Sequence, residues 1–358
     1  MYSVIMAGGS GTRFWPYSRK ERPKQLLNIT GKGPLVLDTC DRLQPLSKDE
    51  EIIIVLGKDH CEETRSLLAD RQINILAEPV GRNTAPCIAL GALYARHLGC
   101  DGPVAFLPAD HYIGNVPAFL DCLEHAGKAC ESGGIVTLGI IPTRPETGYG
   151  YIRGSLDINT LQTNSVFPVS AFVEKPDINK ALEYIQSGDY FWNAGIFVAM
   201  PDTILNETGN LLPETYDALM KLEPCFGKDS FEDKLNEVYS DIESISFDYG
   251  IMEKTDVDVS VVPCECGWSD VGSWESLYEL RSEEHDNNKN LEDGDTLLVD
   301  CENSYVAGMG NRLVTCLGLK DCIVIDREDA LLVTHMKKSQ DIRKIVDELK
   351  RKKREELL

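Results

Sequence analysis

The sequence predicts an α/β protein, with a doubly wound domain around a mostly parallel central sheet and a smaller β-rich domain that ends in a helix. Two observations predict this. Short apolar runs alternate with segments of helical periodicity over most of the chain. From about Glu283 onward the pattern changes, and short β-type runs follow one another between Gly or acidic turns.

The strands expected in the first domain are nearly continuous apolar runs, as in a sheet that is buried on both faces. They cover residues 2–7, 51–56, 104–107, 135–138, 169–173 and 196–199. Helical periodicity predicts helices over 85–98 and 119–130. In such a fold, ligands bind beyond the carboxyl ends of the strands.

Residues 283–295 are polar and rich in turn formers, which is typical of a linker. We therefore expect one domain over 1–285 and a second over 286–358. The second has β-type runs at 296–299, 313–316, 322–325 and 331–334, which predict a small β-helix or sandwich. Its final helix places Ile342, Ile345, Val346 and Leu349 on one face.

Composition excludes several classes of function. A formal net charge of −22 over 358 residues argues against a general partner role for nucleic acid or an anionic membrane. No apolar run is long enough to span a bilayer, and the start of the chain does not resemble a signal peptide. The 12 Cys include no Cys-x-x-Cys pair, so we expect reduced thiols, no zinc site and a cytoplasmic protein.

The loop after the first strand is the most informative motif. It consists of Gly8, Gly9, Ser10, Gly11, Thr12 and Arg13, and Lys24 follows between Pro23 and Gln25. Glycines allow backbone N–H groups to approach an anion closely, and Arg13 and Lys24 add positive charge where a triphosphate would lie. The spacing matches neither a P-loop nor a dinucleotide fingerprint, whose last glycine is replaced by Phe14. A plain βα turn is the alternative.

Two aspartates are candidate ligands of a hard cation. Asp110 follows the strand at 104–107, and Asp270 lies in the frame between Trp268 and Trp274. Because Mg²⁺ takes one or two carboxylates together with substrate phosphates, the pair predicts a magnesium site. A turn-capping role for Asp110 is the alternative.

Four more positions have the chemistry of a sugar phosphate site. Gly150, between Tyr149 and Tyr151, suits close approach of the backbone to a sugar face. Glu174 and Lys175 end a predicted strand, where the carboxylate could accept sugar hydroxyls and the ammonium could reach a phosphate. Asn193 offers an amide at the entry to another strand.

Eight motifs in order along the chain resemble the mannose-1-phosphate guanylyltransferase family. They are Gly8-Gly-Ser-Gly-Thr-Arg13, Phe14-Trp-Pro16, Pro23-Lys-Gln25, Arg82-Asn-Thr-Ala-Pro86, Pro108-Ala-Asp-His111, Phe172-Val-Glu-Lys-Pro176, Trp192-Asn-Ala-Gly195 and Trp268-Ser-Asp-Val-Gly-Ser-Trp274. They span about the first 280 residues, and the tail is similar to that family's small C-terminal domain.

The resemblance implies a GT-A-like, Rossmann-like nucleotidyltransferase fold with a β-helix-like tail. It also implies that GTP and α-D-mannose 1-phosphate give GDP-mannose and pyrophosphate, with Mg²⁺ as cofactor. Long members carry an additional isomerase domain, for which we expect no room here. A homodimer formed through the β-rich tail is one arrangement left open.

The resemblance also implies roles for residues, with Arg13, Lys24 and Lys175 as the catalytic cations. The nucleotide would be bound by Gly8, Gly9, Ser10, Gly11, Thr12, Arg13, Lys24, Arg82, Asn83, Thr84, Ala85 and Asp110, the sugar by Gly150, Glu174, Lys175 and Asn193, and Mg²⁺ by Asp110 and Asp270.

Three alternatives remain open at this point. A related nucleotidyltransferase could use another base or sugar 1-phosphate. A GT-A glycosyltransferase would carry an Asp-x-Asp metal motif, and Asp256-x-Asp258 has that spacing within an apparent strand. A non-catalytic regulatory subunit would have lost charged residues of the site. All five are present: Arg13, Lys24, Asp110, Lys175 and Asp270.

Overall fold

The computed structural model describes residues 1–9, 11–155 and 165–358. The chain forms two compact units that interleave along the sequence. Unit 1 comprises Met1–Gly8, Thr39–Ala109 and Ile113–Trp268; unit 2 comprises Gly9–Asp38, Asp110–Tyr112 and Ser269–Leu358. Unit 2 thus takes two early pieces of the chain in addition to the β-rich tail, so the units do not follow a single cut near residue 285.

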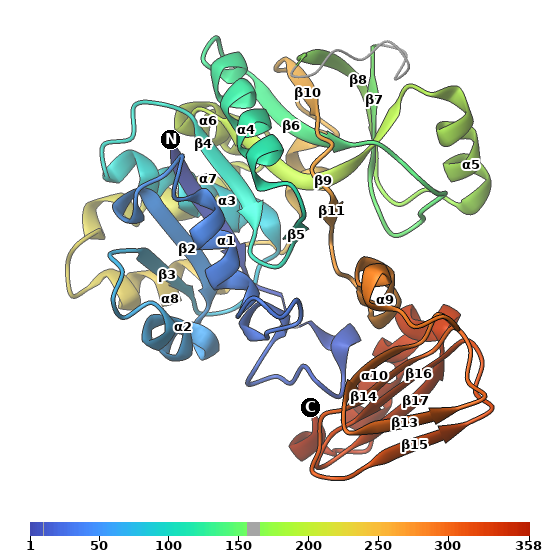
Figure 1. Ribbon diagram of the computed structural model, residues 1–358. Helices are drawn as coiled ribbons and strands as arrows, with labels where there is room; N and C mark the ends of the chain where they lie inside the picture. Colours follow the sequence, from blue (N-terminus) through green and yellow to red (C-terminus); the bar gives the residue numbers. More distant parts are fainter. Residues whose placement is uncertain (10, 156–164) are drawn as a thin grey trace. The chain divides into compact units, whose positions relative to one another are not determined.

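Unit 1 is built on a nine-stranded sheet with the order β3-β2-β1-β4-β9-β6-β10-β8-β7 (Figure 1). Its strands are β1 Tyr2–Ala7, β2 Ile52–Gly57, β3 Asn74–Glu78, β4 Val104–Pro108, β6 Ile135–Ile140, β7 Tyr151–Gly154, β8 Phe167–Val173, β9 Tyr190–Ala199 and β10 Val259–Pro263. A two-stranded sheet pairs β5 Tyr112–Ile113 with β11 Trp268–Ser269.

The large sheet is mixed rather than mostly parallel. Strands β3, β2, β1 and β4 form a parallel half, in which Val4 lies opposite Ile53 on one side and Phe106 on the other. Strand β9 runs antiparallel to β4, β6 and β7, and β8 runs antiparallel to β7 and β10. The apolar runs predicted β1, β2, β4, β6, β8 and β9. Buried runs of this kind do not encode strand direction.

Helices cover the sheet of unit 1. They are α2 Cys61–Leu67, α3 Thr84–His97, α4 Val116–Cys130, α5 Ile178–Ser187, α6 Pro201–Leu211, α7 Pro213–Met220 and α8 Phe231–Asp241, and α1 Leu35–Leu43 joins the two units along the chain. Helix α3 packs closely on β1, because a Cβ atom at Gly91 would lie 2.4 Å from Cγ1 of Val4. Only glycine allows this approach, which fixes the helix against the strand that leads into the glycine-rich loop.

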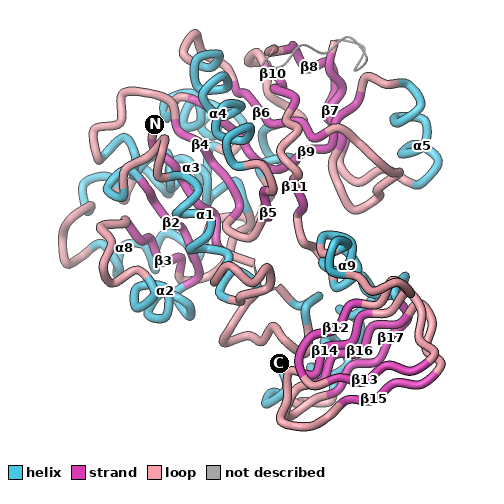
Figure 2. Tube along the Cα trace, in the orientation of Figure 1, coloured by secondary structure: helices cyan, strands magenta, loops and turns pink. Residues whose placement is uncertain are grey.

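Unit 2 contains a β-helix-like stack, whose strands are visible in Figure 2. One sheet has the order β12-β14-β16-β17, with β12 Leu291–Gly294, β14 Tyr305–Gly308, β16 Cys322–Asp326 and β17 Leu331–His335; a second sheet pairs β13 Thr296–Val299 with β15 Val314–Leu317. The pairs are parallel except β16–β17. The expected β-helix with a final helix, α10 Arg343–Arg351, is confirmed.

The interpretation of 283–295 as a linker is wrong for its second half. Leu291 begins β12 and is buried, and Asp293 on the same strand accepts hydrogen bonds from Arg281 and from the hydroxyl of Tyr305. The polar side chains of this strand are paired within unit 2, which composition alone does not reveal. On α10, Val346 is buried, whereas Ile345 remains partly exposed.

The core of unit 2 joins early and late parts of the sequence. Helix α9 Trp274–Leu280 supplies Trp274, which is fully buried and packs edge-on against Phe14 with ring centroids 5.0 Å apart. Trp274 also contacts Tyr305 of β14. The segment after the glycine-rich loop is therefore held by the same core as the β-helix. Within the described residues, no helix is long and apolar enough to cross a membrane.

Candidate active site

Lys24, Asp110 and Asp270 come together in unit 2, and we call these three residues the charged group. The ammonium group of Lys24 donates to Oδ2 of Asp110 at 2.8 Å, to the backbone carbonyl of Asp110 at 2.9 Å and to the backbone carbonyl of Asp270 at 2.6 Å. A lysine ammonium has three N–H donors, and these contacts use all three. The buried lysine thus brings together two segments that are 160 positions apart in sequence.

Gly11 is required for this arrangement. Its φ is +57°, in the left-handed region, and a Cβ atom there would lie 2.5 Å from Cβ of Lys24 and 2.6 Å from its backbone nitrogen. Any other residue would push the loop and the Lys24 segment apart. Ser18 adds a hydrogen bond of 2.7 Å from its hydroxyl to the Gly11 carbonyl.

The remaining predicted phosphate-binding residues of the loop are accessible. Gly9 and Arg13 are exposed, and Thr12 is partly exposed at the start of a short 3₁₀ helix, Thr12–Phe14. Within the described residues, the contact of the Arg13 guanidinium is a long one, 3.5 Å, to the Gly272 carbonyl. It is therefore available to a phosphate, unlike Lys24. Ser10 lies outside the described residues.

Asp110 and Asp270 have properties that fit a hard cation. Burial would raise the pKa of Asp110, but the charge of Lys24, the charge of His111 and the hydrogen bond from Lys24 together hold that pKa below its ordinary value. Asp110 is therefore ionised at neutral pH. Oδ1 of Asp270 accepts the Gly272 N–H at 3.1 Å, which fixes the carboxylate on its own turn. Two oriented carboxylates in one unit match the ligand preference of Mg²⁺.

A second group lies at the carboxyl end of β3 in unit 1, and the sequence did not single out its main member. Glu78 is almost fully buried, and its Oε1 accepts a hydrogen bond of 3.0 Å from Tyr239. Its Oε2 lies on the side of Gly8, 3.7 Å from the position of a Cβ atom there. Burial raises the pKa of Glu78 to about 7. The signal available in the sequence was an acid directly before Pro79, at the start of the segment that leads to Arg82.

The segment from Arg82 to Ala85, which follows Glu78, is held in place by hydrogen bonds to other parts of unit 1. The Arg82 guanidinium donates to the carbonyls of Tyr239 and Ser240 at the end of α8, at 3.0 and 2.6 Å. Asn83 caps α3 through the Thr84 N–H and has a φ of +68°. The Thr84 hydroxyl accepts the Phe247 N–H at 2.8 Å, and the backbone N–H of Ala85, itself buried, bonds to Ile245. These contacts fix the segment from Glu78 to α3 as a rigid turn.

The four predicted sugar-binding residues, which we call the sugar group, come together in unit 1. Gly150, Glu174 and Asn193 meet so closely that a Cβ atom at Gly150 would lie 2.5 Å from Oε2 of Glu174 and 3.3 Å from Cβ of Asn193. The Asn193 N–H also bonds to the Gly150 carbonyl at 2.8 Å. Lys175 reaches Oε1 of Glu174 with its ammonium group. Asn193 lies opposite Gly139 of β6, so the group sits near the carboxyl end of that strand.

Lys175 has an unusual backbone conformation. Its φ is +47°, in the left-handed region that non-glycine residues rarely adopt, and its side chain is more than half exposed. Such backbone strain, of order 1–3 kcal/mol, is typically kept at functional positions. Three aromatic rings pack on one another beside these residues. Tyr149 lies edge-on against Trp192 and Trp268, with centroid distances of 5.2 and 5.3 Å.

Asp248 completes the sugar group and was not predicted. It begins a π-helical turn, Asp248–Met252, and its Oδ1 accepts a hydrogen bond of 2.8 Å from Nδ2 of Asn193. Burial and the nearby charge of Glu174 raise the pKa of Asp248 to about 6. Because Oδ1 of Asn193 also accepts the Gly195 N–H, the orientation of the amide is fixed. No local pattern marks Asp248, since it follows a short irregular segment rather than a strand.

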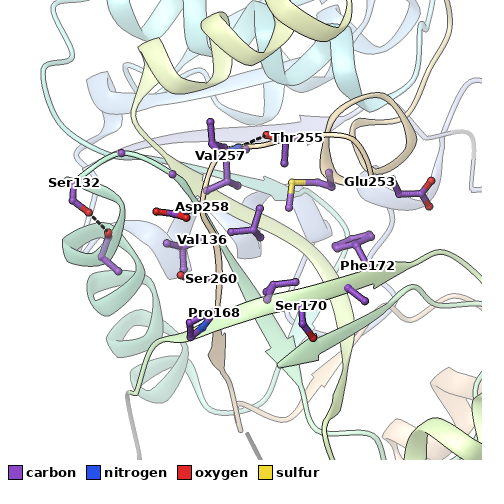
Figure 3. Close-up of a pocket in the computed structure, with 18 residues that line it drawn as sticks. Ser132, Val136, Pro168, Ser170, Phe172, Glu253, Thr255, Val257, Asp258 and Ser260 are labelled. Atoms are coloured by element: carbon purple, nitrogen blue, oxygen red, sulfur yellow. Dashed lines mark hydrogen bonds between the residues drawn. The ribbon is translucent and has the colours of Figure 1, made fainter. Parts of the chain in front are cut away.

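A cavity of about 560 Å³ in unit 1 is not part of this chemistry (Figure 3). It is lined by the amino ends of β6 and β10, by β8 and by the segment around Thr255, so it lies at the end of β6 opposite to Asn193. Among the described residues that line it, the charged ones are Glu253 and Asp258, which disfavour phosphate. The candidate pair Asp256-x-Asp258 precedes β10 and therefore lies at this amino end.

Two family models match the chain. A nucleotidyl transferase model matches residues 2–287, and a model of the mannose phosphate isomerase/GMP-like β-helix domain matches residues 294–349. Together they cover both of the architectures described above.

Known proteins match over nearly the whole chain. A mannose-1-phosphate guanylyltransferase of Salmonella typhimurium is 39% identical over 99% of this chain and 73% of its own length. One from Escherichia coli is 38% identical over 99% of this chain and 74% of its own length. The crystal structure of a protein from Thermus thermophilus, described as a mannose-1-phosphate geranyltransferase, is 36% identical with a TM-score of 0.86, over 98% of this chain and 99% of that one.

Proposed function

Because the chain belongs to the mannose-1-phosphate guanylyltransferase family, we propose that it makes GDP-mannose and pyrophosphate from GTP and α-D-mannose 1-phosphate. The observation that carries this proposal is the sugar group. Gly150, Glu174, Lys175 and Asn193 come from three separate stretches of the chain and meet at one place, as the resemblance implied.

The sugar group has a suitable chemistry for mannose 1-phosphate. Glu174 accepts hydrogen bonds from sugar hydroxyls, Gly150 lets Glu174 and Asn193 lie close against its backbone, and Asn193 presents an amide whose orientation Asp248 fixes. Lys175 is the exposed cation of the group and orients the sugar phosphate. A positioned nucleophile of this kind accounts for a large part of the rate enhancement in a displacement reaction.

Glu78 supports guanine as the base. Guanine has an N1–H and an exocyclic amine on one edge, and a carboxylate can accept both hydrogen bonds. Oε1 of Glu78 is already fixed by Tyr239, so the carboxylate orientation is set before the base binds. Adenine has no donor at N1 and would leave the buried carboxylate unsatisfied, which favours strong discrimination. Binding of guanine donors also lowers the pKa of Glu78 and favours its ionised form.

The glycine-rich loop and the charged group in unit 2 bind the phosphates and neutralise their charge. The backbone of the glycine-rich loop and Arg13 bind the β- and γ-phosphates and stabilise the charge that develops on the leaving pyrophosphate. Lys24 contributes positive charge through its position between the two aspartate segments. Asp110 and Asp270 would hold Mg²⁺, which, when bound, neutralises charge on the phosphate oxygens.

The reaction then needs no covalent enzyme intermediate. An oxygen of the sugar phosphate attacks the α-phosphorus of GTP, the bond from that phosphorus to the bridging oxygen breaks, and the electron pair leaves with pyrophosphate. The nucleophile is already an anion, so no general base is required. Catalysis consists of positioning and charge neutralisation.

We place the reaction in the cytoplasm, because all 12 cysteines have free thiols, which fits a reducing compartment.

Pyrophosphate release tests the proposal directly. The purified protein is assayed with GTP, ATP, UTP and dTTP against mannose 1-phosphate, glucose 1-phosphate and a buffer blank, with Mg²⁺ present. We expect GTP with mannose 1-phosphate to have the highest kcat/KM. Equal efficiency with another pair would assign the chain to a related sugar nucleotidyltransferase, and no release with any pair would support a non-catalytic role.

A variant separates the two substrates. Lys175→Ala should raise KM for mannose 1-phosphate and lower kcat, while GTP binding measured by calorimetry stays close to that of the wild type. Lys180→Ala, on the exposed face of α5, is the matched control. Loss of GTP binding in Lys175→Ala would show that the sugar group has been assigned to the wrong substrate.

A further inference from the structure

The final turn of the chain lies against the segment that follows the glycine-rich loop. Glu355–Leu357 forms a short 3₁₀ helix in unit 2. The backbone carbonyl of Leu357 accepts a hydrogen bond of 2.8 Å from the indole N–H of Trp15 and one of 3.1 Å from the guanidinium of Arg19. Leu358 packs against the hydrophobic core to which Trp15 belongs. We call Trp15, Arg19 and Leu357 the tail clamp.

Arg19 connects the tail clamp to the β-helix. Its Nη2 donates to both carboxylate oxygens of Asp329 at 2.8 and 2.9 Å, directly before β17. The guanidinium lies over the ring of Trp15, 5.5 Å from its centroid. The side chain of Arg19 is 16% exposed, so these interactions are largely shielded from water. A planar guanidinium with five N–H donors suits a position where a carbonyl, a carboxylate and an aromatic ring meet.

Trp15 is held from two sides. Its side chain is bound by the tail clamp, and its carbonyl accepts a hydrogen bond of 3.2 Å from the indole N–H of Trp274. Its own backbone N–H donates to the carbonyl of Thr12 at 3.2 Å, which closes the 3₁₀ turn that contains Arg13. The direction in which the Arg13 side chain leaves the backbone therefore depends on where Trp15 is fixed.

Arg13 needs this support, because its own side chain is exposed and its contact to the Gly272 carbonyl, within the described part of the chain, is a long one of 3.5 Å. A donor stabilises developing charge efficiently when it is already oriented before the reaction. A displacement of about 1 Å in such a group can cost a factor of about a hundred in rate.

We propose that the tail clamp positions Arg13 for the departing pyrophosphate, which makes Trp15, Arg19 and Leu357 positioning residues of the reaction. The choice of pyrophosphate as the ligand rests on the function proposed above. The tail clamp itself touches no phosphate. It acts through the 3₁₀ turn, whose orientation it fixes from the far end of the chain.

Calorimetry with inorganic pyrophosphate and Mg²⁺ tests the proposal without depending on turnover. Trp15→Phe keeps an aromatic ring in the core but removes the donor to Leu357. It should raise the Kd for pyrophosphate by about tenfold and lower kcat by a similar factor, with KM for mannose 1-phosphate unchanged. Tyr278→Phe is the matched control, because this aromatic residue of the same core loses a hydroxyl that donates to the Lys289 carbonyl at 2.6 Å. Both constants should stay at their wild-type values in the control.

A double-mutant cycle with Arg13 separates positioning from general stability. In an Arg13→Ala background, Trp15→Phe should cause no further loss of pyrophosphate affinity or of kcat, because the group that it positions is gone. A general loosening of unit 2 would lower both values equally in the two backgrounds. Leu358→Asp, which releases the tail from the core and leaves the donor of Trp15 in place, should reproduce the effect of Trp15→Phe. It also supplies the test if circular dichroism shows that Trp15→Phe does not fold.

Three results would overturn the proposal. One is a wild type that does not bind pyrophosphate, and another is equal pyrophosphate affinity in the clamp variants and Tyr278→Phe. The third is a loss in Trp15→Phe that persists in full in the Arg13→Ala background. Clamp-dependent pyrophosphate binding without turnover of any nucleotide would instead refute the proposed function and support this inference.

Discussion

The carboxyl group of Glu78 accepts a hydrogen bond of 3.0 Å from the hydroxyl of Tyr239, and both side chains are buried although they lie 161 positions apart. The pKa of Glu78 is raised from its ordinary value of 4.5 to about 7, because burial disfavours the charged form more than the tyrosine stabilises it. The pair thus holds a carboxyl group that is partly protonated at neutral pH until a ligand donates to it.

This pKa predicts a pH dependence of stability. Between about pH 5 and 7 the folded protein keeps a proton on Glu78 that the unfolded chain has lost, so stability falls as the pH rises through this range. The side chain of Glu78→Gln cannot ionise, so this variant does not lose stability at that position as the pH rises. The difference in free energy of unfolding between wild type and variant should therefore change by about 2–3 kcal/mol, in favour of the variant, from pH 5 to pH 7.5.

Urea denaturation of both proteins at several pH values measures this difference. Glu62→Gln, an exposed position on α2, serves as the control and should follow the wild type at every pH. Parallel curves for wild type and Glu78→Gln would show that the carboxyl group titrates normally and is not the buried acceptor described here.

Arg13→Ala should reduce turnover by at least about a hundredfold, as loss of one preorganised donor does. The side chain is exposed and, in the part of the chain that the structure describes, has only a 3.5 Å contact to the Gly272 carbonyl, so the melting temperature should stay unchanged. Arg22→Ala, another exposed arginine of unit 2, is the control for a nonspecific effect of charge. Near-normal turnover in Arg13→Ala would remove this residue from the catalytic set.

Lys24→Met should lower both turnover and stability, in contrast to Arg13→Ala. The methionine keeps the apolar stem but leaves three oxygen atoms of Asp110 and Asp270 without their donor. The expected destabilisation is about 2–4 kcal/mol, since removal of one partner of a buried ion pair costs 3–5 kcal/mol and Asp110 is partly solvated. Lys24→Arg should not restore activity, because the planar guanidinium does not fit three converging acceptors. Full stability of Lys24→Met in thermal denaturation would contradict the bridging role.

Asp110→Asn and Asp270→Asn should each abolish most activity and shift the Mg²⁺ requirement to higher concentration. If both carboxylates hold one ion, the double variant should cost much less than the sum of the two single variants. Steady-state kinetics over a Mg²⁺ titration measures all three. Full activity of Asp270→Asn at low Mg²⁺ would rule out a two-carboxylate site.

Asp248→Ala should raise KM for mannose 1-phosphate by roughly tenfold, the effect expected for losing one hydrogen bond to a charged group. Asp248→Asn should be milder, since its amide oxygen can still accept from Asn193. KM for GTP should change little in both variants. An equal rise of both KM values would indicate general damage to unit 1 rather than a role in orienting Asn193.

Local patterns predicted much of the fold, because a buried strand can be recognised from a short continuous run of apolar residues. The strand at Tyr2–Ala7 has the bounds expected from its apolar run, and the strand-end position of Glu174 and Lys175 pointed to the sugar group. The edge strand β3 was not predicted, because Asn74–Glu78 is only partly buried and lacks a continuous apolar run.

The parts that were missed depend on contacts between distant residues. Nothing near Lys24 in the sequence indicates that this side chain is buried or that its ammonium group donates hydrogen bonds to Asp110 and Asp270. It was therefore predicted only as a phosphate ligand. Asp248 acquires its role from Asn193, 55 positions earlier. In the same way, the polar residues before β13 suggested a linker until Arg281 and Tyr305 were seen to pair with Asp293.

The interleaved composition of unit 2 has a consequence for the order of events during synthesis. The indole N–H of Trp15 donates to the carbonyl of Leu357 at 2.8 Å, and Arg19 donates to the same carbonyl at 3.1 Å. Chains emerge from the ribosome with the N-terminal part first, and domains usually fold in that order. Here the glycine-rich loop leaves the ribosome at the start, yet the segment behind it meets Trp274 only about 260 residues later and Leu357 only after more than three hundred further residues have been added. A nascent chain can therefore complete most of the sheet of unit 1 long before its glycine-rich loop is supported, and a ribosome stalled within the tail would carry a folded sheet whose loop lacks these partners.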